Sequence, residues 1–297
     1  MKRVATAVVL IPIVLLLIFR APIALLAAVV AIVAILAARE FLDLSTHYGV
    51  QPLRKPTYVA VAVIFLVVAI GMGAQTLLLD TGTTMLALLA AAALVPFIFL
   101  AVAMHRDDLP TAFPAAGTSV FAIAYVAIPL AMLVVVCGLS AGGILLFYLF
   151  LVVWSGDTFA YYTGRAIGRH KLAPRVSPGK TWEGTIASFA GSVIVGYLVL
   201  TYARSISETL LHLGVLTRQR AFLSPDPLPI AEIILLSATI NVAAQLGDLV
   251  ESLIKRGAGV KDSGTLLPGH GGMLDRIDAL LFAAPVLWYY AAWHAMV

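Results

Sequence analysis

The sequence predicts an all-α, polytopic integral membrane protein with about nine transmembrane helices. Of its 297 residues, 62% are hydrophobic and only 11% are charged, whereas a soluble domain has about a quarter charged residues. Runs of about 20 apolar residues, the length that crosses a bilayer, recur along the chain. This composition excludes a large soluble core. Nucleic-acid binding is also excluded, because the basic residues lie in short loops between spans rather than on one domain face.

Nine apolar runs are long enough to be spans. Pro12, Pro96 and Pro129 fall inside them and fit kinks in packed membrane helices better than breaks. We expect Lys2, Arg3 and the first run to form a retained helix rather than a cleaved signal peptide, because a second apolar run follows at once. The predicted spans are 4–19, 22–38, 57–79, 83–104, 117–138, 143–163, 181–203, 230–253 and 273–295.

The longest polar interval, residues 204–229, contains the stretch SISETLLHLG, which predicts a surface helix. Cys137 is the only cysteine and lies in an apolar run. It can therefore form no internal disulfide, and we expect it to be packed in the core.

The basic residues sort onto one side of the predicted spans. When the loops alternate between two sides, Arg20, Arg204, Arg218 and Arg220 lie on one side, and the rest of the 19 Lys and Arg residues lie on the N-terminal side. Such a bias marks the cytoplasmic side. We therefore expect a cytoplasmic N-terminus, an external C-terminus and a location in the inner membrane of a bacterial cell.

Carboxylates gather at the cytoplasmic ends of the C-terminal spans. Asp157 lies in the sixth predicted span, Asp248 and Glu251 lie near the end of the eighth, and Asp275 and Asp278 begin the ninth. Each of the last two pairs is spaced three residues apart and therefore shares a helix face. Acids at one membrane edge are costly unless they serve a function.

Two cytoplasmic loops, 164–180 and 254–272, flank these acids and are rich in Lys and Arg. Carboxylates without clustered His or Cys favour Mg²⁺ over Zn²⁺, and Lys and Arg beside a metal favour phosphate oxygens. The glycines of PGHGG let backbone N–H groups approach an anion. The sequence thus predicts a metal–phosphate site in a catalytic part, 141–297. Residues 1–140 would form a scaffold with surfaces for oligomer contacts, such as those of a homodimer.

The stretch SLIKRGAGVKDSGTLLPGHGGMLDRIDAL, residues 252–280, resembles the signature of the phosphatidate cytidylyltransferases, also called CDP-diacylglycerol synthases. That signature is S-x-hydrophobic-K-R, four residues, K-D, then P-x-H-G-G, then D-R-hydrophobic-D, and every position matches. The stretches GDLVES and SPGKTWEG are also similar to family elements. The resemblance implies a nucleotidyltransferase of phospholipid biosynthesis, which converts CTP and phosphatidic acid into CDP-diacylglycerol and pyrophosphate within a lipid membrane.

The resemblance also implies a metal site. Asp248, Asp275 and Asp278 would hold Mg²⁺, and Asp157 would be a further metal ligand or would support the others. A second cation is compatible with the family.

Other roles follow from the same resemblance. Lys180 and Thr181 would reach the lipid phosphate or the triphosphate, and Asp262 would orient the loop. The residues expected to contact phosphates or to hold the carboxylates in place are Ser252, Lys255, Arg256, Lys261, His270 and Arg276.

Two alternative functions stay open. An ion-coupled transporter also carries acids in its membrane segments, but it would place them near mid-span and often in two related halves. Another lipid-phosphate enzyme, similar to a polyprenol kinase, would use similar polar groups. The one-sided site and the unbroken signature favour the cytidylyltransferase.

Overall fold

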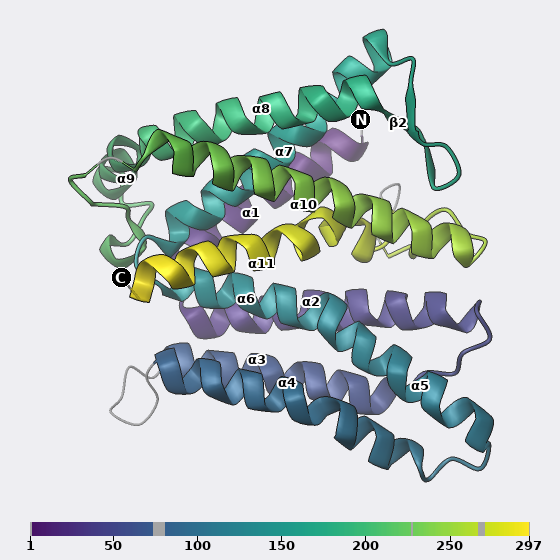
Figure 1. The fold of residues 1–297 in the computed structure, drawn as a ribbon. Coiled ribbons are helices and arrows are strands. Elements are labelled where there is room, and N and C mark those ends of the chain that lie inside the picture. The colour runs from purple at the N-terminus through teal and green to yellow at the C-terminus, as the bar shows by residue number, and fades with distance from the viewer. Residues whose placement is uncertain (1, 74–80, 227, 267–270, 297) are drawn as a thin grey trace.

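The computed structural model describes residues 2–73, 81–226, 228–266 and 271–296, and these residues are mostly helical (Figure 1). A helix lies at every predicted span. In chain order the elements are α1 (Lys2–Arg20), α2 (Ile23–Thr46), α3 (Arg54–Gly73), α4 (Thr81–Ala103), α5 (Leu109–Ala122), the π-helical turn η1 (Ile123–Ala127), α6 (Ile128–Gly138), α7 (Gly142–Ile167), β1 (Lys171–Ala173), β2 (Ser177–Thr181), α8 (Trp182–Thr201), α9 (Ala203–His212), the 3₁₀ turn η2 (Arg218–Arg220), α10 (Ile230–Gly257) and α11 (Leu274–Met296).

The described helices are those of a multi-pass membrane protein. Among them, six are long and apolar enough to cross a bilayer: Ile23–Thr46, Arg54–Met72, Leu109–Gly138, Gly142–Ile167, Trp182–Thr201 and Ile230–Gly257. The helices α1, α4 and α11 lie outside this set, so nine membrane crossings stay a prediction.

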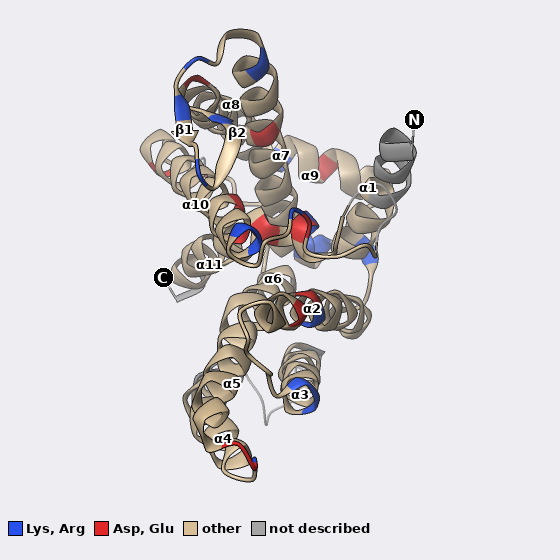
Figure 2. Cartoon of the chain, turned by 90° about the vertical axis from the view of Figure 1, so that its right-hand side faces the viewer, with Lys and Arg blue, Asp and Glu red and all other residues tan. Residues whose placement is uncertain are grey.

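The long helices run side by side in one bundle (Figure 1). Helix α8 packs on α7 and α10, α11 packs on α10 and α6, and α2 packs on α3. Their connections alternate between two ends, and the end that carries the β1–β2 hairpin bears many of the charged side chains (Figure 2). At the opposite end, Arg220 donates hydrogen bonds to the backbone carbonyl oxygens of Ile18 and Ala21, each at 2.5 Å. The connection after α1 and the polar interval 204–229, which the sequence predicted to lie on the same side of the membrane, are therefore in contact.

Several local predictions are confirmed. The surface helix predicted in the polar interval is α9, and Cys137 is buried. Pro12 and Pro96 lie inside α1 and α4 without ending either helix.

The all-α prediction is supported, and two local details differ from it. The fifth helical run begins at Leu109 rather than at residue 117, since Pro110 fits a first helical turn, where its missing N–H group costs nothing. The all-α prediction also missed the hairpin in loop 164–180, where β1 pairs antiparallel with β2 and Lys171 lies opposite Thr181. The hairpin leads directly into α8, because the Thr181 hydroxyl oxygen accepts a hydrogen bond from the backbone N–H of Gly184 at 3.2 Å and so caps that helix.

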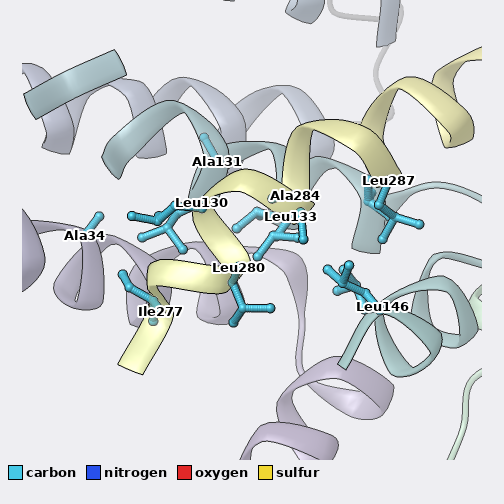
Figure 3. Close-up of a cluster of buried hydrophobic side chains, with 14 of the residues drawn as sticks. Ala34, Leu130, Ala131, Leu133, Leu146, Ile277, Leu280, Ala284 and Leu287 are labelled. Carbon is cyan, nitrogen blue, oxygen red and sulfur yellow. The ribbon is translucent and has the colours of Figure 1, made fainter. Parts of the chain in front are cut away.

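Helix α11 is buried along one face, which fixes its rotation about its own axis. Ile277, Leu280, Ala284 and Leu287 recur at helical spacing and are all buried. Figure 3 shows them against side chains of α2, α6 and α7, among which the labelled residues are Ala34, Leu130, Leu133 and Leu146. Packing of this kind is what holds helices together where lipid competes for the apolar surface. The rotation of α11 in turn determines where the side chains of Asp275 and Asp278, in its first turns, point.

Helices α10 and α11 touch backbone to backbone at Gly247. A Cβ atom at this position would lie 2.4 Å from the carbonyl oxygen of Asp278 and 3.2 Å from the Cα of Ala279. Only glycine allows this approach. Since Asp248 follows Gly247 directly, the contact brings the acids of α10 next to those of α11.

We expect Gly247→Ala to lower the melting temperature in detergent, because the added methyl group would push α10 and α11 apart. Overpacking of this kind costs about 1–3 kcal/mol. The matched control is Gly117→Ala in α5, where a new Cβ would meet no atom within 4 Å and alanine favours the helix. Equal melting temperatures for the two variants would contradict the proposed close contact.

Candidate active site

The predicted site residues that the structure describes come from α7, β2, α10, α11 and the segment that follows α10. The end of the bundle that carries the β1–β2 hairpin is rich in charged residues (Figure 2). The structure gathers the site residues into two groups, each built around a lysine. His270 lies outside the described residues. Arg256, Lys261, Asp262 and Arg276 are exposed at this end, and Arg256 donates a hydrogen bond to the carbonyl oxygen of Val260 at 3.2 Å.

The first group is a buried ion cluster around Lys255. The Lys255 Nζ atom lies 2.5 Å from Glu251 Oε2 and 2.5 Å from Asp275 Oδ1. The side chain of Glu251 is fully buried, and those of Lys255 and Asp275 are 12% and 6% exposed. One lysine therefore pairs with acidic side chains from both α10 and α11 and links the two helices.

Asp275 also orders the loop that precedes α11. Its Oδ2 atom accepts hydrogen bonds from the backbone N–H of Ser263 at 2.9 Å, the Ser263 hydroxyl at 3.0 Å and the backbone N–H of Gly272 at 2.7 Å. Gly271 has a φ of +76°, and a Cβ there would lie 2.5 Å from the same oxygen. This glycine of the PGHGG stretch is thus required by backbone geometry and by the closeness of the carboxylate.

The second group surrounds Lys180 and is more open. The Lys180 Nζ atom lies 2.8 Å from Asp248 Oδ2, and the Ser252 hydroxyl donates a weak hydrogen bond of 3.4 Å to Asp248 Oδ1. The carboxylates of Asp157, Asp248 and Asp278 lie close enough to interact electrostatically, and Lys180 also acts on Asp157. Asp157 is exposed and the Asp248 side chain is 40% exposed. Asp157, Lys180 and Asp248 are therefore at least partly exposed, whereas the Lys255 cluster is buried.

A polar network on α10 supports the second group. Asn241 donates hydrogen bonds of 2.8 Å to the hydroxyls of Ser188 and Ser192 on α8, and Gln245 donates one of 2.5 Å to Asn241. Sequence analysis missed this network. The signal was present, because Asn241, Gln245, Asp248, Ser252 and Lys255 follow one another at spacings of four and three residues, which place them on one face of α10.

Glu40 on α2 is a further residue that the sequence analysis missed. It is 8% exposed, and its carboxylate accepts hydrogen bonds from the backbone N–H groups of Met273 at 2.9 Å and Leu274 at 2.8 Å and from the Ser263 hydroxyl at 3.0 Å. These partners lie more than 220 residues away in the chain. An acid inside the apolar run AILAAREFL was the one available signal.

The chemistry of the open group fits a hard cation. Asp157, Asp248 and Asp278 offer only carboxylate oxygens, the donors that Mg²⁺ prefers. Asp275 is different, because hydrogen bonds and the Lys255 ion pair already engage both of its oxygens. In the part of the chain that the structure describes, no three His, Cys, Asp or Glu side chains are grouped tightly enough to surround one ion.

The fold and the site together define a class of protein: a helical membrane protein with a lysine–carboxylate site at one end of its bundle. A family model described as the cytidylyltransferase family matches residues 1–294. The chain therefore belongs to the cytidylyltransferase family.

Individual relatives are similar over part of their length. A phosphatidate cytidylyltransferase of Haemophilus influenzae is 42% identical over 149 residues, which are 50% of this chain and 46% of the relative. The protein of the same name from Bacillus subtilis is 39% identical over 147 residues, 50% and 47% of the two chains. That of Thermotoga maritima is 47% identical over 133 residues, 45% and 43% of the two chains. The chain thus spans about half the length of the curated relatives it matches.

We expect Lys255→Met to lower the melting temperature strongly, because it leaves the buried Glu251 and Asp275 carboxylates without a cation. Removing one partner of a buried ion pair costs about 3–5 kcal/mol. Arg256→Met, at the next residue of α10, changes an exposed side chain and should melt close to the wild type. Thermal melting in detergent compares the two, and similar values would show that the Lys255 cluster is not essential for stability.

Proposed function

We propose that the protein is a phosphatidate cytidylyltransferase, which joins CTP and phosphatidic acid to give CDP-diacylglycerol and pyrophosphate. One observation supports this most directly. Lys180 of the hairpin lies 2.8 Å from the Asp248 carboxylate and also acts on Asp157, at the end of a helical membrane bundle that belongs to the cytidylyltransferase family. Relatives that share about half of the chain carry the name phosphatidate cytidylyltransferase.

The proposed reaction requires positioning more than acid–base chemistry. An oxygen of the lipid phosphate attacks the α-phosphorus of CTP, a new P–O bond forms, and the bond to the leaving pyrophosphate breaks. The second pKa of a phosphate monoester is about 6, so the attacking group is largely ionised at pH 7 and requires no strong base. The main barrier lies in bringing two polyanions together in line.

The residues of the two groups divide this task. Lys180, near the open end of the site, would bind a phosphate of CTP or of the lipid, as lysine does through its charge. The exposed Lys261, Arg256 and Arg276 would bind further phosphate oxygens. The Lys255–Asp275 pair would keep the loop that carries Lys261 in place.

Asp157, Asp248 and Asp278 would hold Mg²⁺, which when bound neutralises phosphate charge. This assignment departs in one respect from the role that the resemblance implies for Asp275. That carboxylate is engaged by Lys255 and by the loop, so we assign it to ordering the loop. A second cation and a homodimer formed through residues 1–140 stay predictions.

The decisive experiment is incubation of the purified protein with labelled CTP, phosphatidic acid and Mg²⁺. We expect labelled CDP-diacylglycerol, and we expect excess EDTA to abolish its formation. Product that forms undiminished in EDTA would contradict the metal assignment. Ion transport in liposomes without any CDP-diacylglycerol synthesis would instead favour the transporter.

Two variants define the site in the same assay. Asp278→Asn should lower turnover about 10²–10³-fold, the usual cost of losing one charge contact in the transition state. Arg169→Ala, an exposed residue that precedes the hairpin, should retain near-full activity. Thermal melting of both variants is the control for folding.

The charged end of the bundle would face the cytoplasm of a bacterial cell, where CTP is available, because most of the basic residues are assigned to that side. Single cysteines placed at Arg175 and Val260 should then react with an impermeant thiol reagent only in inside-out vesicles. One at Arg218 should react only in right-side-out vesicles. The native Cys137 is buried and gives a low background. The reverse pattern would place the site on the wrong side for CTP.

A further inference from the structure

Glu40 acts as a cap for helix α11, although it belongs to α2. The first N–H groups of a helix have no partner within that helix. Here the backbone N–H groups of Met273 and Leu274 donate to the two carboxylate oxygens of Glu40, at 2.9 and 2.8 Å. A negative charge at a helix N-terminus is also favoured by the helix dipole.

The chain is shaped closely around this carboxylate. A Cβ at Gly272 would lie 2.3 Å from Glu40 Oε2, and one at Gly264 would lie 2.7 Å from Oε1. The Ser263 hydroxyl lies 3.0 Å from Glu40 Oε2 and 3.0 Å from Asp275 Oδ2. Glu40 is thus connected through Ser263 to Asp275, and through Asp275 to Lys255.

The turn that follows α2 contacts the last turn of α10, from which the same loop begins. The Tyr48 hydroxyl donates a hydrogen bond of 2.7 Å to the backbone carbonyl oxygen of Ile254, in the last turn of α10. A Cβ at Gly257 would lie 2.0 Å from that hydroxyl oxygen. Helix α2 therefore contacts the start of α11 through Glu40, and the turn that follows α2 contacts the end of α10 through Tyr48.

We propose that Glu40 is a positioning residue of the catalytic site, which sets Asp275 and the first turn of α11 through its contacts with Ser263, Met273 and Leu274. This inference rests on the proposed function for its kinetic consequence. It adds a residue from the N-terminal part of the chain to a site whose other members come from α7 onward. Glu40 touches no reacting atom in this arrangement, so its effect is on geometry.

The test is Glu40→Gln, which preserves side-chain shape but replaces one accepting oxygen with an NH₂ group. At least one of the three hydrogen bonds must then be lost, because an NH₂ group cannot accept from a backbone N–H. The matched control is Asp43→Asn, one turn further along α2, where the carboxylate pairs with Arg39 and Arg54 at the surface. Both variants remove one negative charge from the same helix.

We expect Glu40→Gln to lower kcat about 10- to 100-fold, because a small displacement of Asp275 and the first turn of α11 misplaces the site. KM for CTP should change less than about threefold. The melting temperature should fall below that of Asp43→Asn, because a buried N–H group loses its acceptor, but the variant should stay folded at the assay temperature. Asp43→Asn should keep wild-type kcat. Full kcat in Glu40→Gln, or a loss of kcat matched by Asp43→Asn, would overturn the proposal.

A double-mutant cycle with Ser263→Ala separates positioning from general stability. If Glu40 acts through Ser263, the kcat losses of Glu40→Gln and Ser263→Ala are less than additive in the double variant, as expected for residues in one network. Additive losses that follow a drop in melting temperature would make Glu40 merely structural and overturn the proposal. Ser263→Ala alone also tests the connection if Glu40→Gln does not fold.

Hydrogen exchange provides a readout that does not depend on activity. Amides 272–274 should exchange faster in Glu40→Gln than in Asp43→Asn, because Glu40 no longer holds the first turn of α11. Equal exchange in the two variants would overturn the proposal. If the wild type makes no CDP-diacylglycerol, the proposed function fails, and exchange still decides whether Glu40 holds this turn.

Discussion

The ion cluster of Lys255 with Glu251 and Asp275 is the constraint on which the site depends. Two carboxylates from different helices are buried at the edge of an apolar bundle, with Lys255 2.5 Å from each. Charges in such surroundings are tolerated only when they are paired with an opposite charge. The pairing requires α10 and α11 to approach closely, which Gly247 permits. It also fixes Asp275, and Asp275 fixes the loop through Ser263 and Gly272.

Lys255 and Lys180 differ in side-chain exposure, and this difference indicates a structural role for Lys255 and a ligand-binding role for Lys180. Lys255 is 12% exposed and makes two ion pairs with buried carboxylates. Its charge therefore stabilises the fold and is not available to bind a ligand. Lys180 is 23% exposed and pairs with Asp248, itself 40% exposed. Partly exposed pairs are weak, because water competes for both groups. A phosphate or a cation could therefore replace the Lys180–Asp248 contact at little cost, whereas breaking the Lys255 cluster would strand a buried charge.

The sequence predicted the helices well, because hydropathy is a local property that accumulates over about 20 residues. Helical spacing predicted that Asp248 with Glu251, and Asp275 with Asp278, would share helix faces. The structure divides each pair, because Glu251 and Asp275 contact Lys255, whereas Asp248 and Asp278 belong to the open group. The sequence did not predict the hairpin, whose strands are short and depend on pairing with each other. Nor could it predict Glu40, because the contact with Ser263 spans 223 residues and no local pattern encodes such a distance.

The role of Asp275 shows where inference from a motif ends. Its place in the signature implies a metal ligand, but its surroundings in the structure are those of a loop anchor, with donors on both oxygens. The same reasoning connects the two parts of the chain. Helix α11 packs against α2 and α6 through its buried face (Figure 3), and its first turn is capped by Glu40. Residues that precede α7 therefore set the starting point of the helix that carries Asp278 and contribute, with α7 and α10, to its rotation. In this structure residues 1–140 shape the geometry of the site as well as the surface of the bundle.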